Sequence, residues 1–89
     1  MHIREFQQFI SDAYDETDRR RGLSKNFMWF IEEVGELSSA LASQDRENQA
    51  EEFADCLAWL CTLANLSDID IEKAIEKYTR REVKGFKPS

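Results

Sequence analysis

Apolar residues recur at helical spacing in four successive stretches of the chain. Between residues 3 and 14, and again from Lys25 to Ala42, they fall three or four positions apart, which is typical of one helical face. The run from Cys56 to Leu66 has apolar residues on nearly every side and predicts a helix that is buried all round. A last helix is predicted from Ile71 through Tyr78. Since the sequence has no strand or β-hairpin signal, we predict an all-α fold, a small bundle of about four helices.

Short polar segments separate the predicted helices and carry capping residues. The segment from Asp18 to Gly22 is expected to be an Arg-rich connector, in which Gly22 ends one helix or forms a turn and Ser24 caps the next. Asp45 and Asp70 are the expected N-caps of the third and fourth helices. We expect one domain, with an N-terminal helix and connector at 1–22, motif-bearing helices at 23–81 and a tail at 82–89.

Length and charge limit the classes of protein to consider. At 89 residues a single core is only marginally sufficient, so association into a homodimer or homotetramer is expected to supply the missing burial. The net charge of −6 argues against nucleic-acid or membrane binding, because those partners need a basic surface. The sequence shows neither the apolar segment of a signal peptide nor a membrane-spanning run, and a cytoplasmic location is expected.

Carboxylates gather at two places on the predicted helices. Glu33 and Glu36 are three positions apart and lie on one flank of the apolar stripe of the second helix, whereas Glu32 lies nearly opposite that stripe. Glu52 and Asp55 repeat the three-residue spacing at the start of the third helix. A tight hairpin between the two helices makes them antiparallel neighbours, so the two acidic pairs are expected to meet.

Carboxylates close to apolar surroundings either protonate or find a partner, because an unpaired buried charge is expensive. For facing carboxylates, the expected partner is a hard divalent cation. Oxygen-only ligation without a well-placed His or Cys suits Mg²⁺ or Mn²⁺ far better than zinc. The only histidine is His2, so neither histidine catalysis nor a di-iron centre built on Glu-x-x-His is expected.

A non-catalytic interpretation stands beside the metal site. Charged residues make up 34% of the chain, and acidic pairs on helices are commonly solvated surface. On that interpretation the protein is a helical interaction module whose acidic patch meets a basic partner or none.

Basic and aromatic residues near the acidic pairs have two interpretations each. The three consecutive arginines that end at Arg21 form either a solvated loop or an arm that reaches substrate phosphates. Basic residues of the last helix, among them Lys77 and Arg81, either complement the helix dipole or form a phosphate-binding rim. Trp29 and Trp59 either stack on a base or fill a subunit interface.

Taken together, the two acidic groups resemble the hallmark of the MazG-type nucleotide pyrophosphohydrolases, which is EExxE followed by ExxD. Here the motifs stand as EEVGE at 32–36 and EFAD at 52–55. The resemblance covers Gly22 to Arg81 and includes IDIEKAI at the start of the last helix. The superfamily is all-α and also includes the dimeric dUTPases and the phosphoribosyl-ATP pyrophosphohydrolases.

The resemblance implies an activity and a set of roles. Mg²⁺ would be ligated by Glu33, Glu36, Glu52 and Asp55, and Glu32 would orient or deprotonate water. The implied reaction is hydrolysis of a nucleoside triphosphate between its α- and β-phosphates, in a house-cleaning role against non-standard nucleotides. Phosphoribosyl-ATP pyrophosphohydrolase activity is the alternative within the family.

One departure from the family concerns the phosphate-binding residues. Many members place a Lys and an Asn near the start of the C-terminal basic stretch, whereas this chain reads EKYTRR at 76–81, without an Asn. Lys77 and Arg81 are the candidates that remain in that stretch, and Arg21 is the candidate from the connector.

Overall fold

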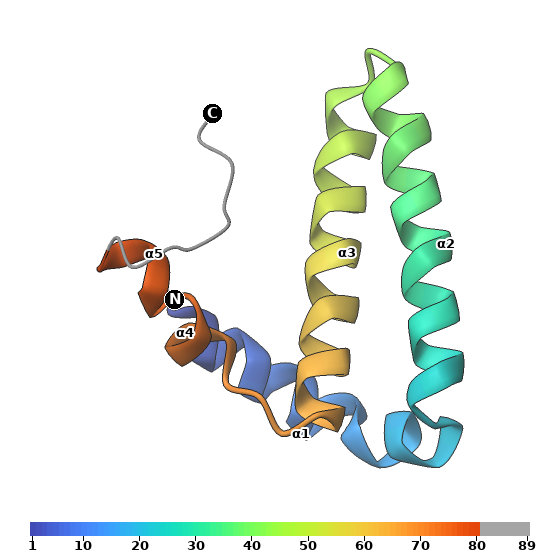
Figure 1. Ribbon diagram of the computed structural model, residues 1–89. Helices are drawn as coiled ribbons and strands as arrows, with labels where there is room; N and C mark the ends of the chain where they lie inside the picture. The colour runs from blue at the N-terminus through green and yellow to red at the C-terminus, as the bar shows by residue number, and fades with distance from the viewer. Residues whose placement is uncertain (81–89) are drawn as a thin grey trace.

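The computed structural model describes residues 1–80, and over this range the secondary structure is helical, without a strand (Figure 1). Within these residues no helix is both long and apolar enough to cross a membrane. The all-α prediction is therefore confirmed. In chain order the helices are α1 (Ile3–Arg21), α2 (Leu23–Ala42), α3 (Arg46–Leu66), α4 (Ile71–Ala74) and α5 (Glu76–Thr79).

The first helix is longer than the sequence suggested. Residues 18–21, predicted to be a connector, continue α1 as regular helix, and Gly22 alone separates it from α2. Gly22 has a φ of 93°, a conformation that glycine adopts without steric cost, and its N–H donates to the Asp18 carbonyl at 3.0 Å. The expected cap by Ser24 is wrong, because α2 begins at Leu23 and Gly22 holds the N-cap position without a side chain.

Helices α2 and α3 form the antiparallel hairpin that the short linker predicted (Figure 1). Asp45 caps α3 as expected, and its carboxylate accepts the N–H of Asn48 at 3.1 Å. Gln49, which is buried, donates to the carbonyls of Ala40 and Ser43 at 3.1 and 2.9 Å. These bonds satisfy carbonyls at the end of α2 and hold the two helices in register.

The C-terminal part of the described chain lies along α1. Asp70 caps α4 as expected, accepting the backbone N–H groups of Glu72 and Lys73, and its carboxylate also pairs with Arg4 at 2.9 Å. The predicted last helix is interrupted at Ile75, which divides it into two helices of four residues each. Residues 81–89 lie outside the described range, and with them the tail predicted at 82–89.

Much of the apolar surface is not covered within one chain. The prediction that the third helix is buried all round is wrong for the single chain, because Leu57 and Leu60 of α3 are 43% and 44% exposed. The apolar stripe of α2 is not fully packed against α3 either, since Phe27 and Ile31 are 51% and 50% exposed. A periodic pattern identifies an apolar face without saying which neighbour covers it.

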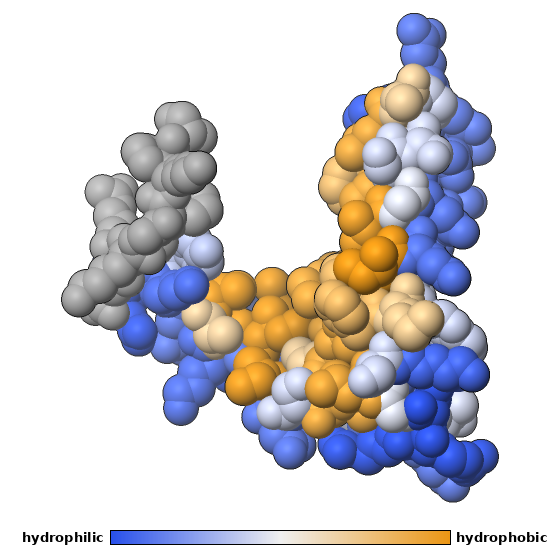
Figure 2. Space-filling view, turned by 45° about the vertical axis from the view of Figure 1, so that its right-hand side comes forward, coloured by the Kyte–Doolittle hydropathy of each residue, from blue (hydrophilic) through white to orange (hydrophobic). Residues whose placement is uncertain are grey.

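The exposed apolar residues of the hairpin gather on one side of it. Counted at about 100° per residue, the exposed apolar residues of α2 lie opposite Glu36, and those of α3 lie opposite Asp55. Figure 2 shows this surface as a continuous apolar area that runs from the hairpin onto the part of the molecule below it. We call it the apolar hairpin face, and it comprises Phe27, Ile31, Val34, Leu41, Phe53, Leu57 and Leu60.

Candidate functional site

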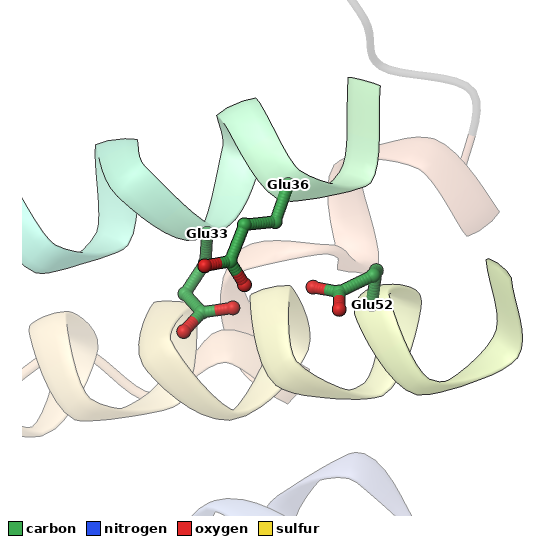
Figure 3. A group of neighbouring side chains, drawn as sticks. All are labelled: Glu33, Glu36 and Glu52. Carbon is green, nitrogen blue, oxygen red and sulfur yellow. The ribbon is translucent and has the colours of Figure 1, made fainter. Parts of the chain in front are cut away.

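Three carboxylates from the two hairpin helices point toward one another. Glu33 and Glu36 come from adjacent turns of α2, and Glu52 comes from α3 (Figure 3). One oxygen of each lies within 4.8 Å of the others, a spacing suited to a shared cation. The antiparallel hairpin creates this arrangement, because it places the middle of α2 beside the first turns of α3. We call these three residues the carboxylate cluster.

The cluster contains oxygens that lack the partner they need. The Oε2 atoms of Glu33 and Glu52 are buried and have no hydrogen-bond partner among residues 1–80. Loss of solvent, with added repulsion from Glu36, Asp55 and Glu52, raises the pKa of Glu33 to about 7. Loss of solvent is also the largest cause that raises the pKa of Glu52. Buried acceptors without donors fit a bound cation, and all-oxygen donors fit Mg²⁺ or Mn²⁺.

Asp55 and Glu32 do not belong to the carboxylate cluster. Both side chains are exposed, and neither belongs to the group whose oxygens lie within 4.8 Å. The negative charge of Asp55 nevertheless helps to raise the pKa of both Glu33 and Glu52, which places it close to them. Cys56 is also near, since the cluster contributes after desolvation to the raised pKa of its thiol. Glu32 precedes Glu33 on α2 and faces solvent.

A pocket of about 340 Å³ lies beside the cluster, between α1 and the hairpin. Trp29 precedes Glu33 by one turn of α2 and Trp59 follows Asp55 by one turn of α3, a rise of about 6 Å along each helix axis. The rings meet edge to face with centroids 5.7 Å apart. We call this the tryptophan pocket, and it is lined by Ile10, Tyr14, Thr17, Asp18, Arg21, Trp29, Ala58, Trp59 and Thr62.

Arg21 lines the tryptophan pocket instead of extending from a loop. Its guanidinium carbon lies 4.1 Å from the centroid of the Trp29 ring, within the range of a cation–π contact. Its Nη1 donates to the carboxylate of Asp18 at 3.1 Å and to the side-chain oxygen of Asn26 at 2.9 Å. The helix that replaces the predicted connector thus fixes Arg21 at one wall of the pocket.

Lys77 lies apart from the carboxylate cluster within this chain. It belongs to α5, which packs on α4 at the end of α1 that lies away from the hairpin (Figure 1). Its ammonium lies 5.1 Å from the centroid of the Tyr78 ring. Arg81, the other phosphate candidate of this stretch, lies outside the described residues.

Sequence reasoning missed the polar residues of the tryptophan pocket. The sequence pattern places Asp18 only in a connector, yet Asp18 is 6% exposed and accepts a hydrogen bond from the hydroxyl of Thr62 at 3.1 Å. The spacing of three residues between Trp59 and Thr62 could have placed Thr62 on the same face. Nothing in the local sequence pairs Asp18 with a residue 44 positions away.

Comparison with known protein families identifies the family to which this helical hairpin belongs. The family model described as the MazG nucleotide pyrophosphohydrolase domain matches residues 21–86, a segment that contains all of α2 and α3 and therefore both acidic motifs. A comparison with curated proteins gives no match. The matched segment makes up well over half of the chain, and it carries the carboxylate cluster and both tryptophans. The chain therefore belongs to the MazG nucleotide pyrophosphohydrolase family.

Proposed function

We propose that this chain is a Mg²⁺-dependent nucleoside triphosphate pyrophosphohydrolase. Water would attack a phosphoanhydride-linked phosphorus, the bond between the α- and β-phosphates would break, and the products would be a nucleoside monophosphate and pyrophosphate. The observation that carries this proposal is the carboxylate cluster, where acidic side chains converge and two buried oxygens lack partners. Membership of the family supplies the class of substrate.

The residues of the cluster would hold the metal ion. Glu33, Glu36 and Glu52 would provide the converging oxygens, and Asp55 would complete the set from the next turn of α3. Mg²⁺, or Mn²⁺ in its place, would neutralise phosphate charge and lower the pKa of the attacking water. Glu32, which is exposed next to Glu33, would orient that water or accept its proton.

The tryptophan pocket would receive the nucleoside. Its two tryptophans lie one helical turn from Glu33 on α2 and from Asp55 on α3, so a nucleotide with its phosphates at the carboxylates could reach the pocket with its base. Trp59 and Trp29 would provide the aromatic walls. Arg21, which lines the same pocket, would contact the base from its place on the Trp29 ring.

A second copy of the chain would cover the apolar hairpin face. This surface lies opposite Glu36 and Asp55 around their helices, so a homodimer or homotetramer could bury it without covering these two carboxylates. Burial of such a surface is the main driving force of stable association. Lys77 and Arg81 would then bind phosphates only if assembly brings them to the cluster of another copy.

Pyrophosphate release tests this proposal. The full chain is incubated with standard and modified nucleoside triphosphates and with phosphoribosyl-ATP, in Mg²⁺, in Mn²⁺ and in EDTA. The proposal predicts monophosphate and pyrophosphate from at least one triphosphate, with no release in EDTA. A folded protein that releases pyrophosphate from none of these compounds would contradict the proposal and favour an interaction module.

A further inference from the structure

The lining of the tryptophan pocket includes a buried carboxylate. Asp18 is 6% exposed, although it is an acidic residue on an outer helix of a small protein. Its Oδ1 accepts from Arg21 at 3.1 Å and its Oδ2 accepts from the hydroxyl of Thr62 at 3.1 Å. Charged groups are rarely buried unless they are paired. Here the pairing fixes the carboxylate in position at the edge of the cavity.

The hydrogen bond from Thr62 decides what this part of the pocket can bind. A threonine hydroxyl has a single proton, and the proton of Thr62 is directed to Asp18. The oxygens of Thr62 and Asp18 can therefore only accept a hydrogen bond from a ligand in the pocket that both residues line. Two acceptors about one hydrogen-bond length apart suit a ligand group that carries two N–H donors.

The other polar groups of the pocket are compatible with a ligand that donates N–H groups to Asp18 and Thr62. The hydroxyls of Tyr14 and Thr17 can rotate to donate or to accept, so they match either kind of base edge. Both hydrogen bonds described for Arg21 come from Nη1, which leaves Nη2 and Nε to donate to a base nitrogen or carbonyl. A base edge that carries a hydrogen-bond donor beside an acceptor could thus donate to Asp18 and accept from Arg21 at the same time.

We infer that the tryptophan pocket selects nucleotides whose base carries an exocyclic amino group, and that Asp18 and Thr62 are the residues that determine this specificity. The inference rests on the proposed function, because it assumes that the base enters this pocket. Carboxylates accept well from the amino group of cytosine. Uracil and thymine have one ring N–H flanked by two carbonyls, so a pose that donates to Asp18 also brings a carbonyl oxygen against an acceptor.

Tryptophan fluorescence measures binding in this pocket directly, because the chain has two tryptophans and both line it. The full chain with Mg²⁺ is titrated with α,β-imido analogues of dCTP, dATP, dGTP, dUTP and dTTP, which resist hydrolysis at the proposed bond. The variants are Asp18→Asn and Thr62→Val. The matched control is Asp12→Asn, since Asp12 is on the same helix and is exposed, with a hydrogen bond from Gln8.

At least one amino-bearing analogue is expected to bind about tenfold or more tighter than the uracil and thymine analogues. Asp18→Asn and Thr62→Val should each reduce that preference, whereas Asp12→Asn should keep it. If Asp18→Asn fails to fold by circular dichroism, Thr62→Val and the wild-type ranking still decide. Equal binding of all analogues by the wild type, or an unchanged preference in the folded variants, would overturn the inference.

The two proposals fail in different ways. Pyrophosphate release without any base preference in binding would contradict the role of Asp18 and leave the proposed reaction standing. A base preference in binding without pyrophosphate release from any triphosphate would contradict the proposed reaction and leave the role of Asp18 standing.

Discussion

The carboxylates of Glu33 on α2 and Glu52 on α3 face one another across the hairpin, and each has a buried oxygen without a hydrogen-bond partner among residues 1–80. Like charges at this separation repel, and the loss of water strengthens the repulsion. A fold that holds them together therefore either protonates one carboxyl or binds a cation. The raised pKa of Glu33 is the response of the metal-free protein.

A divalent cation should stabilise the fold. Binding to the native state alone adds about 2.7 kcal/mol at a hundredfold excess over the dissociation constant, which corresponds to a rise of roughly 11–22 °C in Tm for a chain of this size. We expect Mg²⁺ to raise the Tm of the wild type, and Glu33→Gln to reduce that rise. Differential scanning fluorimetry at fixed protein concentration measures these Tm values, and NaCl at equal ionic strength is the control. An equal rise of the Tm in NaCl would contradict the prediction.

The stability of the metal-free protein should depend on the proton held by Glu33. Its pKa of about 7 lies above the ordinary value of 4.5, so in that interval the folded state binds a proton that the unfolded chain has released. Stability is then greatest below the ordinary value and falls as the pH rises through 7. In EDTA we expect the Tm to fall from about pH 5 to about pH 8 by a few degrees.

The control for this pH effect is Glu33→Gln, which lacks the titrating group. Glu52, the other carboxyl whose pKa is raised by burial, acts in the same direction. Asp70 acts in the opposite direction, because its bond with Arg4 lowers its pKa below the ordinary 3.8, and its contribution changes only at lower pH. A Tm that falls equally in the wild type and in Glu33→Gln would show that Glu33 does not hold the proton.

Asn26 should be important for stability although it touches no proposed substrate or metal. It is fully buried, and its amide donates to the carbonyls of Asp18 and Gly22 at 2.8 Å each, while its oxygen accepts from Arg21. We expect Asn26→Ala to destabilise the protein by about 2 kcal/mol, because buried polar groups lose their partner. Urea unfolding measures this. Asn48→Ala, at a half-buried position in the first turn of α3, is the comparison variant and should have a smaller effect.

The apolar hairpin face should mediate self-association. Ile31 is 50% exposed in one chain, and a lysine there would place an unpaired charge in any interface that covers it. We expect Ile31→Lys to lower the molar mass measured by light scattering after size-exclusion chromatography. Gln44→Lys adds the same charge in the loop between α2 and α3 and should leave the mass unchanged. A wild type that is already monomeric would contradict the expectation.

The fold could be predicted largely because its signals are local. Helical periodicity located α2 and α3, and the carboxylates of Asp45 and Asp70 marked the helix starts where the structure has them. The end of α1 was misjudged, because consecutive arginines look like a loop. In the structure Arg19 and Arg20 pair with Asp15 and Glu16 one turn earlier, and such pairs support a continued helix.

Of the candidate site, the carboxylate cluster could be predicted from the sequence and the tryptophan pocket could not. Residues three positions apart on a helix share a flank, so the meeting of Glu33, Glu36 and Glu52 followed from spacing and a short hairpin. The contacts of Asp18 with Thr62, and of Trp29 with Trp59, depend on how α1 and the two hairpin helices pack. Periodicity contains no information about that packing, and so the tryptophan pocket could be seen only in the structure.

The most direct measurement of the central claim is pyrophosphate release by Glu36→Gln beside Glu47→Gln. Both variants replace a hairpin glutamate with its amide, but Glu36 belongs to the carboxylate cluster and Glu47 is exposed in the first turn of α3. With Mg²⁺ and a triphosphate that the wild type hydrolyses, we expect Glu36→Gln to lose about a hundredfold or more of its rate and Glu47→Gln to retain it, while both remain folded. Equal rates in the two folded variants would contradict the assignment of the carboxylate cluster as the metal site of a pyrophosphohydrolase.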